Sequence, residues 1–299
     1  MFPVFLSIGN YSLSSFGVFL ALGFLLGIFL VWRLSRAWDL DEEKTLDITL
    51  LTLLGGFLGA RIYFAIEHLQ DFSSPLNLIL INKAPGLSFW GGILGGWLTL
   101  VFLARRKRLN FWQLADIGVV GLLGGLIMSN IGCFLGGCDI GSPSKAFFAV
   151  TMIGSVGKRW PIQIIEALFL TVSLANVWFH ATHFHQRGKI VSLAFVYIGV
   201  SKLVLEPFRQ DHSGVIFSVL FILLGATIFY RLTKQTPLIH LKILRQFLIK
   251  FFTDPNSRKD VVQTLNKTWY NQKTALGWRW RNFKKLLKKL LRRSNVKLS

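Results

Sequence analysis

The stretch "SFGVFLALGFLLGIFLVW" (Ser15–Trp32) contains 18 residues and no charged side chain. An α-helix rises about 1.5 Å per residue, so a run of this length nearly matches the roughly 30 Å hydrocarbon core of a bilayer. Further apolar runs of similar length follow at 45–66, 87–104, 112–131, 162–180, 189–206 and 213–230. The sequence therefore predicts seven transmembrane helices.

The composition is that of a membrane protein and not of a soluble one. Of the 299 residues, 52% are hydrophobic and only 16% are charged. A soluble domain carries about 25% charged residues, which it needs to cover its surface. We therefore predict an all-α integral membrane protein.

The positions of the basic residues predict how the spans are oriented. With seven spans, the connectors on one side carry Arg33, Arg36, Lys44, Arg105, Arg106, Lys107, Arg108, Arg187 and Lys189. The chain after Tyr230, which lies on the same side, carries 18 of the 34 Lys and Arg residues. Because cytoplasmic loops are enriched in Lys and Arg, we expect the N-terminus outside and the C-terminus in the cytoplasm. The first residues have no basic n-region, so we expect no cleaved signal peptide.

The chain divides into a predicted membrane domain (1–232) and a basic cytoplasmic tail (233–299). In the tail, "TPLIHLKILRQFLIKFF" (236–252) begins with a Thr cap followed by Pro, which favours a helix start. The segment "WRWRNFKKLLKKLLRRS" (278–294) gathers its apolar residues on one helical face and its basic residues on the other. This pattern is typical of a helix that lies on an anionic membrane surface. Contact with nucleic acid or the ribosome through the same charges, and a disordered tail, are the less favoured alternatives.

A glycine-rich segment at the end of the fourth span holds both cysteines. "SNIGCFLGGCDIGSP" (129–143) contains Cys133, Cys138 and four glycines. Glycine permits positive φ and close approach, and irregular backbone at membrane depth must pack in protein or line a wet cavity, so we expect a re-entrant loop at the outer face. The cysteines fit either a disulfide or two buried thiols, and a catalytic thiol would need a basic neighbour such as Lys145. With two cysteines and no nearby histidine, we predict no metal site.

Pairs of glycines four residues apart recur in the predicted spans. They are Gly55 with Gly59, Gly91 with Gly95, Gly92 with Gly96, and Gly121 with Gly125. Small residues at this spacing let two helices approach closely in a membrane. We interpret them as helix-packing faces.

Ionisable side chains inside spans are costly unless they are paired, and they point to function. The spans and their ends hold Arg61, Asp116, Glu166, Lys202, Glu206 and Arg209. Lys202 and Glu206 are four residues apart and could simply neutralise each other. Asp116, close to the basic cytoplasmic loop, could be a surface partner. Arg61, Glu166, Glu206 and Arg209 fall in the outer halves of their spans, which favours a polar cavity open to the outer leaflet.

Five stretches, in this order, resemble the bacterial prolipoprotein diacylglyceryl transferases. They are "FLGARI" (57–62), "LSFWGGILGG" (87–96), "IGCFLGGCDIG" (131–141), "RWPIQIIEALF" (159–169) and "GKIVSLAFVYIGVSKLVLEPFRQD" (188–211). The resemblance covers roughly residues 1–232. It implies seven spans with the N-terminus outside, a place in the bacterial inner membrane, and no cofactor.

The resemblance also implies a reaction and its partners. Members of the family take the diacylglyceryl group from phosphatidylglycerol and join it by a thioether to the cysteine of a lipoprotein precursor, releasing glycerol 1-phosphate. The acceptor thiol belongs to the substrate, so the enzyme needs no cysteine of its own. Such a site must bind a phosphate, for which the bidentate guanidinium of arginine is well suited, and must help to remove the thiol proton.

Family positions carried onto this sequence give a candidate site. The implied catalytic residues are Glu166, Lys202, Glu206 and Arg209. The implied substrate-binding residues are Arg61, Trp90, Gly91, Gly92, Asn130, Gly132, Cys133, Gly141 and Gln163.

The sequence also departs from the family pattern at several positions. Trp90 stands where the family has a histidine, Asn130 and Cys133 replace the arginine and asparagine of its "GRxGN" loop, and Phe16 and Ile198 replace tyrosines. Lys202 replaces an arginine. One interpretation is a transferase whose Lys202, Arg209 and Arg61 bind the phosphate. The alternative is a non-catalytic membrane protein that binds lipid or lipoprotein on the same fold. We expect the transferase.

Overall fold

The computed structural model describes residues 2–8, 11–68, 88–152, 154–210 and 214–233, together with single positions between 259 and 285. The chain divides into two compact units, Met1–Lys234 and Gln235–Ser299. In the second unit the described positions are helical. The tail helix predicted at 236–252 lies outside the described residues, as does most of the one predicted at 278–294.

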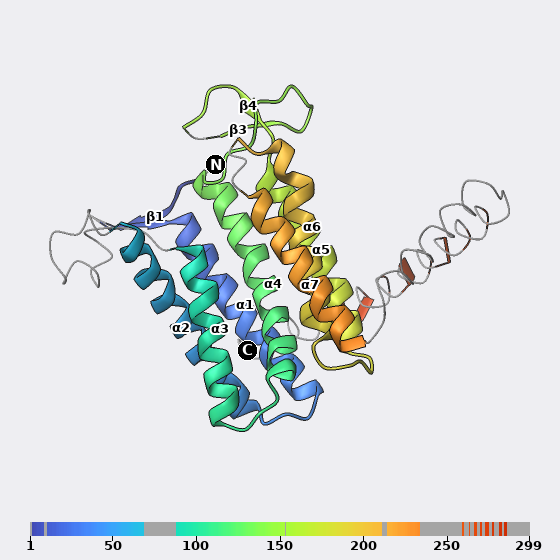
Figure 1. Cartoon of the computed structure of the whole chain (residues 1–299). Helices are drawn as coiled ribbons and strands as arrows, with labels where there is room; N and C mark the ends of the chain where they lie inside the picture. The colour runs from blue at the N-terminus through green and yellow to red at the C-terminus, as the bar shows by residue number, and fades with distance from the viewer. Residues whose placement is uncertain are drawn as a thin grey trace, which may run out of the picture. The chain divides into compact units, whose positions relative to one another are not determined.

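Seven α-helices make up most of the first unit (Figure 1). They are α1 (Ser15–Ala37), α2 (Glu42–Glu67), α3 (Phe89–Arg106), α4 (Phe111–Gly136), α5 (Ile162–Ala181), α6 (Lys189–Leu205) and α7 (Val215–Thr233). A short 3₁₀ helix, η3 (Glu206–Phe208), continues α6. Each predicted span therefore coincides with a helix.

Six of these helices are long and apolar enough to cross a membrane, and α3 is the exception. Its 18 residues include four glycines, two tryptophans and, in the last turn, two arginines. These residues lower its mean hydropathy although it packs among the others. The described residues thus form a mostly helical protein with the helices of a multi-pass membrane protein.

The structure is mostly helical, as predicted, and adds two short hairpins that the prediction did not include. Strands β1 (Val4–Ile8) and β2 (Tyr11–Ser14) pair antiparallel immediately before α1, whose N-terminus is capped by the Ser14 side chain. Strands β3 (Val150–Thr151) and β4 (Lys158–Arg159) pair antiparallel between α4 and α5. The apolar pattern that identified the spans contains no signal for pairings of two to five residues.

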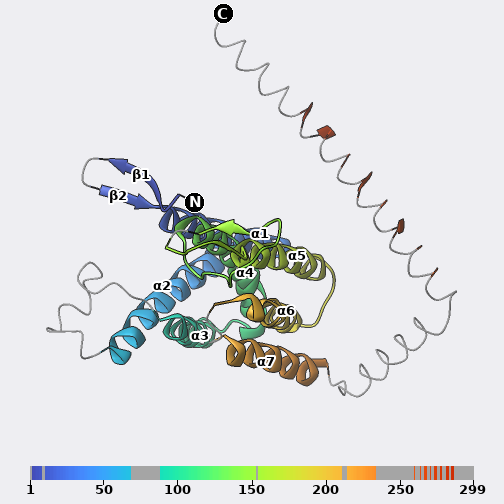
Figure 2. The same cartoon turned by 90° about the horizontal axis from the view of Figure 1, so that it is seen from above.

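Helix α4 lies in the middle of the first unit. It contacts α1, α3, α5 and α6, while α2 packs on α3 and α7 packs on α6 (Figure 2). The main hydrophobic core follows this arrangement, because fully buried Val120 and Leu123 of α4 belong to one cluster with Leu34 of α1 and Ile190 of α6. Because this core joins α4 to α1, α5 and α6, a charged residue on the buried face of α4 would disturb three of its neighbours at once.

The glycine pairs lie at helix contacts, which confirms their interpretation as packing faces. A Cβ at Gly59 would clash with the carbonyl of Gly91, and one at Gly95 would clash with the carbonyl of Gly55, so α2 and α3 touch backbone to backbone. Helices α1 and α4 meet in the same way, with the Gly121 carbonyl 3.0 Å from a Cβ built at Gly27. These contacts fix the distance between the helix axes.

Two predictions about α4 require correction. The fourth span does not end at residue 131, because α4 continues to Gly136 and stops at Gly137, whose φ of 82° suits glycine. The irregular loop therefore begins later than expected. Asp116 is not a surface partner, because its side chain is completely buried and accepts hydrogen bonds from the backbone N–H groups of Gly188 (2.5 Å) and Val191 (2.7 Å). It caps the N-terminus of α6 across the helix bundle.

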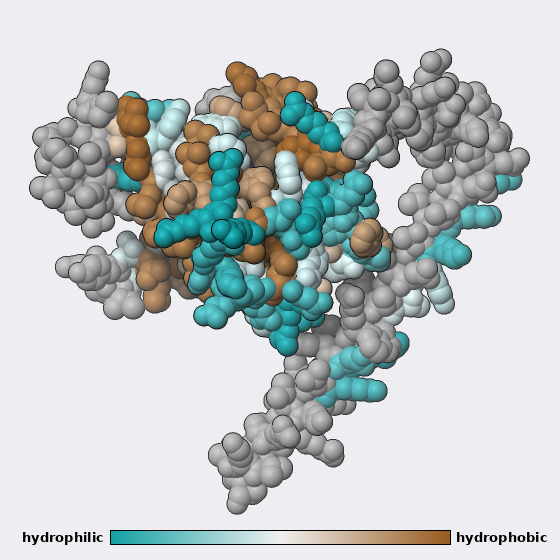
Figure 3. Space-filling model, turned by 60° about the horizontal axis from the view of Figure 1, so that its bottom comes forward, coloured by the Kyte–Doolittle hydropathy of each residue, from teal (hydrophilic) through white to brown (hydrophobic). Residues whose placement is uncertain are grey.

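The connections α1–α2, α3–α4 and α5–α6 lie at the same end of the first unit (Figure 1). With this end turned toward the viewer, Figure 3 shows hydrophilic residues gathered over it and hydrophobic residues on the flanks. These are the connectors that carry the basic residues used above to orient the spans.

Candidate active site

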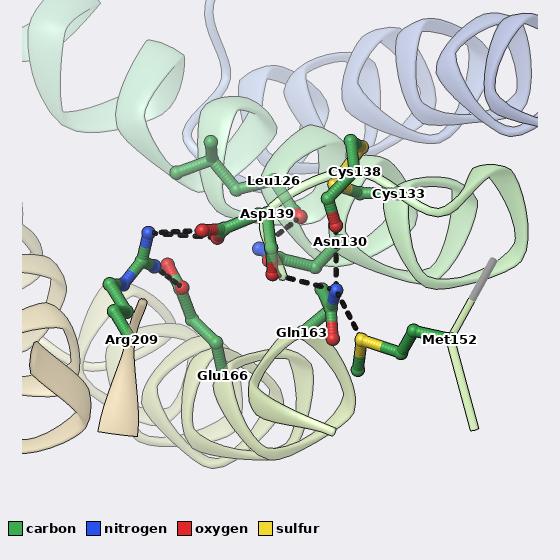
Figure 4. The surroundings of a disulfide bond; sticks show 9 residues. All are labelled: Leu126, Asn130, Cys133, Cys138, Asp139, Met152, Gln163, Glu166 and Arg209. Carbon is green, nitrogen blue, oxygen red and sulfur yellow. Dashed lines mark hydrogen bonds and ion pairs between the residues drawn. A yellow bond between two sulfur atoms is a disulfide. The ribbon is translucent and has the colours of Figure 1, made fainter. Parts of the chain in front are cut away.

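Charged side chains from three separate segments meet near the ends of α4, α5 and α6. Glu166 comes from α5, Lys202 from α6, Arg209 follows η3, and Asp139 follows α4 (Figure 4 draws all but Lys202). We call these four residues and Glu206 the ion cluster. It unites the four residues that the resemblance assigned to catalysis.

Glu166 is the centre of the ion cluster. Its side chain is 2% exposed, and its two carboxylate oxygens bind different cations. Oε1 lies 2.9 Å from the Lys202 Nζ, and Oε2 lies 2.6 Å from the Arg209 Nη2. A carboxylate this deeply buried is tolerated because both oxygens are paired.

Each nitrogen of the Arg209 guanidinium lies near a different carboxylate. Nη2 binds Glu166, Nη1 lies 2.8 Å from Asp139 Oδ2, and Nε lies 3.8 Å from Glu206 Oε2. The exposed fractions of the partners differ, since the Asp139 side chain is 32% exposed and those of Glu166 and Glu206 are 2% and 5% exposed. The guanidinium is thus held on its buried sides and reachable on the Asp139 side.

Lys202 and Glu206 each contact groups outside α6. Lys202 forms its ion pair with Glu166, across to α5. Glu206 accepts a hydrogen bond from the Gly214 backbone N–H at 2.8 Å, at the start of α7, and faces Arg209. The i, i+4 spacing placed both residues on one face of the helix, but their contacts link α6 to α5 and to the start of α7.

The segment after α4 is anchored to the rest of the site through its backbone. The Gln163 side-chain amide of α5 donates to the carbonyls of Cys138 (2.6 Å) and Asp139 (2.8 Å). A disulfide joins Cys133, in the last turn of α4, to Cys138, which settles the choice between disulfide and thiols. Asp139 has a φ of 56°, a left-handed conformation that these bonds hold in place.

A strand-like pairing connects this segment to the end of the sixth helix. Gly141 and Arg209 form an antiparallel bridge, and the Ser142 N–H donates to the Phe208 carbonyl at 2.8 Å. A Cβ at Gly141 would collide with the Trp160 carbonyl, so the close approach requires glycine. The backbone itself therefore sets the distance between Asp139 and Arg209.

The other predicted binding residues divide between the site and helix contacts. Asn130 lies beside Asp139 and Gln163 (Figure 4), and its amide donates to the Leu126 carbonyl at 3.0 Å. Gly132 packs against Phe16 and Phe19 of α1. Its neighbour Cys133 is in the disulfide.

Four predicted binding residues lie at or near the contact between α2 and α3. Gly91 packs against the backbone of α2, and Gly92 lies beside Ala60. The Trp90 ring packs on Phe217 of α7, with 4.0 Å between ring centroids. Arg61 is 6% exposed, with its guanidinium 5.8 Å from the Phe64 ring centroid.

Asp139 and Arg159 belong to the site although the sequence did not single them out. Asp139 is the only acid in the glycine-rich segment, which was a usable signal. Arg159 donates to the Gly141 carbonyl (3.1 Å) and to the Gln210 side chain (2.8 Å). It lies in the stretch 159–169, one of the five that resemble the family. Burial raises the pKa of the Asp139 carboxyl above its usual range, and the Arg209 guanidinium opposes that rise.

The chemistry available to the cluster is anion binding and proton transfer. Lys202 and Arg209 can hold a phosphate, and carboxylates beside them can accept a proton. Within the described residues, no group of His, Cys, Asp and Glu side chains is arranged to hold a metal ion.

Comparisons with known proteins identify relatives of this chain. The family described as prolipoprotein diacylglyceryl transferase matches residues 3–231. The phosphatidylglycerol–prolipoprotein diacylglyceryl transferase of Deinococcus radiodurans is 38% identical over 144 residues, which cover 46% of this chain and 42% of that protein. Transferase 2 of Clostridium perfringens is 25% identical over 74% of this chain and 91% of its own. The Synechococcus elongatus transferase is 26% identical over 79% of this chain and 90% of its own.

The matched region takes in helices α1 to α6, α7 except for its last two residues, and every residue of the ion cluster. The expected resemblance is therefore confirmed, and the chain belongs to the prolipoprotein diacylglyceryl transferase family.

Proposed function

We propose that this protein transfers the diacylglyceryl group of phosphatidylglycerol to the cysteine thiol of a lipoprotein precursor. The family match and the names of its relatives confirm the expected transferase class. The observation that carries the proposal is the ion cluster, in which Lys202 of α6 and Arg209, directly after η3, both bind Glu166 of α5.

In this proposal Arg209 and Lys202 bind the phosphate of the lipid. Their positive charge stabilises the negative charge that grows on the phosphate as it leaves. Glu166 orients both cations and, being almost fully buried, keeps them from turning toward solvent. Lys202 supplies a point charge where the family has an arginine, so the phosphate gains charge stabilisation there without a bidentate hydrogen bond.

Complementation of a bacterium depleted of its own transferase tests the function. Membranes are probed for the mass increase of a lipoprotein precursor that carries a diacylglyceryl group. We expect the chain to restore modification, and an Arg209→Gln variant at equal abundance to fail. Good expression without modification would favour the alternative, a protein that binds lipid or lipoprotein without catalysis.

We further propose that all seven helices, α3 included, span the inner membrane, with the N-terminus outside. The three basic connectors at one end of the first unit support this orientation. Reporter fusions after Arg108 and after Tyr230 should both read cytoplasmic, whereas one after Ser142 should read external. Opposite locations for Arg108 and Tyr230 would contradict the seven-span topology.

For the tail we propose attachment to the anionic membrane surface, on the strength of its basic amphipathic pattern at 278–294. A peptide of this segment should bind vesicles that contain phosphatidylglycerol, with binding that weakens as salt rises. Equal binding to uncharged vesicles would contradict the electrostatic part of the proposal.

A further inference from the structure

Asp139 occupies the more exposed side of Arg209, which is the side that a lipid phosphate would approach. Both of its terminal nitrogens are bound to carboxylates, Nη2 to Glu166 and Nη1 to Asp139. A phosphate that binds a terminal nitrogen of the guanidinium therefore competes with one of them. The two carboxylates differ greatly in how easily a phosphate can displace them from Arg209.

Glu166 is the carboxylate that stays. It is 2% exposed and is held by Lys202 through its second oxygen, so its departure would leave two cations without their shared partner. Asp139 is 32% exposed, and its ion pair in the described residues is with Arg209 alone. Displacement of Asp139 from Arg209 therefore breaks a single ion pair, which is partly exposed to solvent.

The backbone of Asp139 is fixed while its side chain can turn. Gln163 binds the carbonyls of residues 138 and 139, the disulfide ties Cys138 to α4, and residue 141 pairs with residue 209. Rotation about the side-chain bonds of Asp139 therefore opens Arg209 without moving the loop.

We propose that Asp139 is the exchangeable counter-ion of Arg209: the phosphate of the donor lipid takes its place, and the released carboxylate accepts the proton of the acceptor thiol. This inference rests on the proposed function and adds an order of events to it. The lipid must bind first, because only then is the Asp139 carboxylate free to act as the base. Of the three carboxylates in the ion cluster, Asp139 is the most exposed and so the one that a second substrate can reach.

The step balances. The thiol proton passes to an Asp139 oxygen, the sulfur electron pair forms the C–S bond to the glycerol carbon, and the C–O bond to the phosphate breaks. Its electron pair leaves on glycerol 1-phosphate, and the proton returns to solvent when the product departs. The exchange assists the transfer, because a carboxylate that has lost its cation and gained an anionic neighbour is more basic.

The variant Asp139→Asn tests both halves of the inference. The full chain in nanodiscs is titrated with dihexanoyl-phosphatidylglycerol, and transfer to a peptide with an acceptor cysteine is measured in parallel. Without the competing carboxylate, we expect binding to tighten roughly three- to ten-fold, the range for one partly exposed ion pair. Without the base, we expect kcat to fall about 100-fold or more.

Two further variants separate this role from a structural one. Asp139→Glu keeps the charge and should retain binding and most of the turnover. Asp47→Asn, which removes an exposed pair with Lys107, should change neither quantity. A merely structural Asp139 would lose binding and turnover together in Asp139→Asn.

The pH dependence of lipid binding gives a test that needs no variant. The probe is a phosphodiester with one negative charge between pH 5 and 8, so changes come from the protein. Asp139 faces Arg209, Glu166, Lys202 and Glu206. Because protonation of Asp139 frees Arg209, binding by the unmodified chain should tighten as the pH falls, and Asp139→Asn should lack this change.

The outcomes test the Asp139 exchange and the proposed transferase function separately. Unchanged or weaker binding in Asp139→Asn would overturn the exchange, and unchanged turnover would overturn the proton transfer. If that variant does not fold, binding by the unmodified chain that is flat or weaker at low pH overturns the inference. Absence of transfer by the unmodified chain would refute the proposed function, while the titrations would still decide the exchange.

Discussion

Replacement of Glu166 by glutamine should destabilise this protein more than any other change of a single atom in the ion cluster. Glutamine has the same shape, but it turns one carboxylate oxygen into an NH₂ group and removes the charge. Lys202 Nζ and Arg209 Nη2, now 2.9 Å and 2.6 Å from the two oxygens, would share one neutral acceptor. One of the two cations would face a donor.

The magnitude follows from the burial of the three side chains. Removal of one partner from a buried ion pair costs about 3–5 kcal/mol. The cations here are 26% and 15% exposed, so water screens them in part and the lower end, about 3 kcal/mol, applies. For a folded unit of this size, each kcal/mol lowers Tm by roughly 2–4 °C, so Tm should fall by about 6–12 °C.

Thermal unfolding in nanodiscs, followed by the fluorescence of the 10 tryptophans, measures this change. The matched control is Glu43→Gln, since Glu43 is exposed in the first turn of α2 and its change should stay within about 0.5 kcal/mol. Adding Lys202→Met to Glu166→Gln removes one stranded cation and should recover about 1 kcal/mol or more.

Equal Tm values for Glu166→Gln and Glu43→Gln would refute the assignment of Glu166 as the centre of the cluster. Strictly additive effects of Glu166→Gln and Lys202→Met would refute their coupling. Either result would mean that the cations find other partners at no cost.

Two further predictions concern residues where this chain departs from its family. Serine at both Cys133 and Cys138 should leave transfer within a few-fold, because the acceptor thiol comes from the substrate and Gln163 still holds the loop; a thousand-fold loss in folded protein would assign the disulfide a direct role. The triple change Trp90→His, Asn130→Arg and Lys202→Arg restores the family residues and should raise transfer or phosphatidylglycerol affinity through added bidentate phosphate contacts. If the folded triple variant changes neither quantity, the family assignments at these positions do not apply to this chain.

The helices could be predicted from the sequence because length and hydropathy decide them locally. A bilayer offers the backbone no hydrogen-bond partners, so an apolar run such as 15–32 must be helical. The glycine spacing also predicted which helix faces pack closely. The chain beyond residue 131 was predicted less well, because glycine favours a loop in general and α4 nevertheless continues to Gly136.

The sequence indicated which charged residues gather in the ion cluster better than it indicated their contacts. Glu166, Lys202, Glu206 and Arg209 stand out as charges in apolar runs, and the family resemblance grouped them. The i, i+4 spacing suggested that Lys202 pairs with Glu206, yet Lys202 binds Glu166. Spacing along one helix carries no information about a carboxylate that a neighbouring helix presents.

The sequence by itself determined which segments are helices, where the ionisable residues lie along them, and the family. Only the tertiary structure decided that Asp139 joins Arg209 across 70 positions of sequence, and that Asp116 caps α6 from α4. The physical reason is that hydropathy and helix periodicity act between near neighbours in the chain. An ion pair instead depends on where packed helices bring distant side chains, and that position exists only once the helices are assembled.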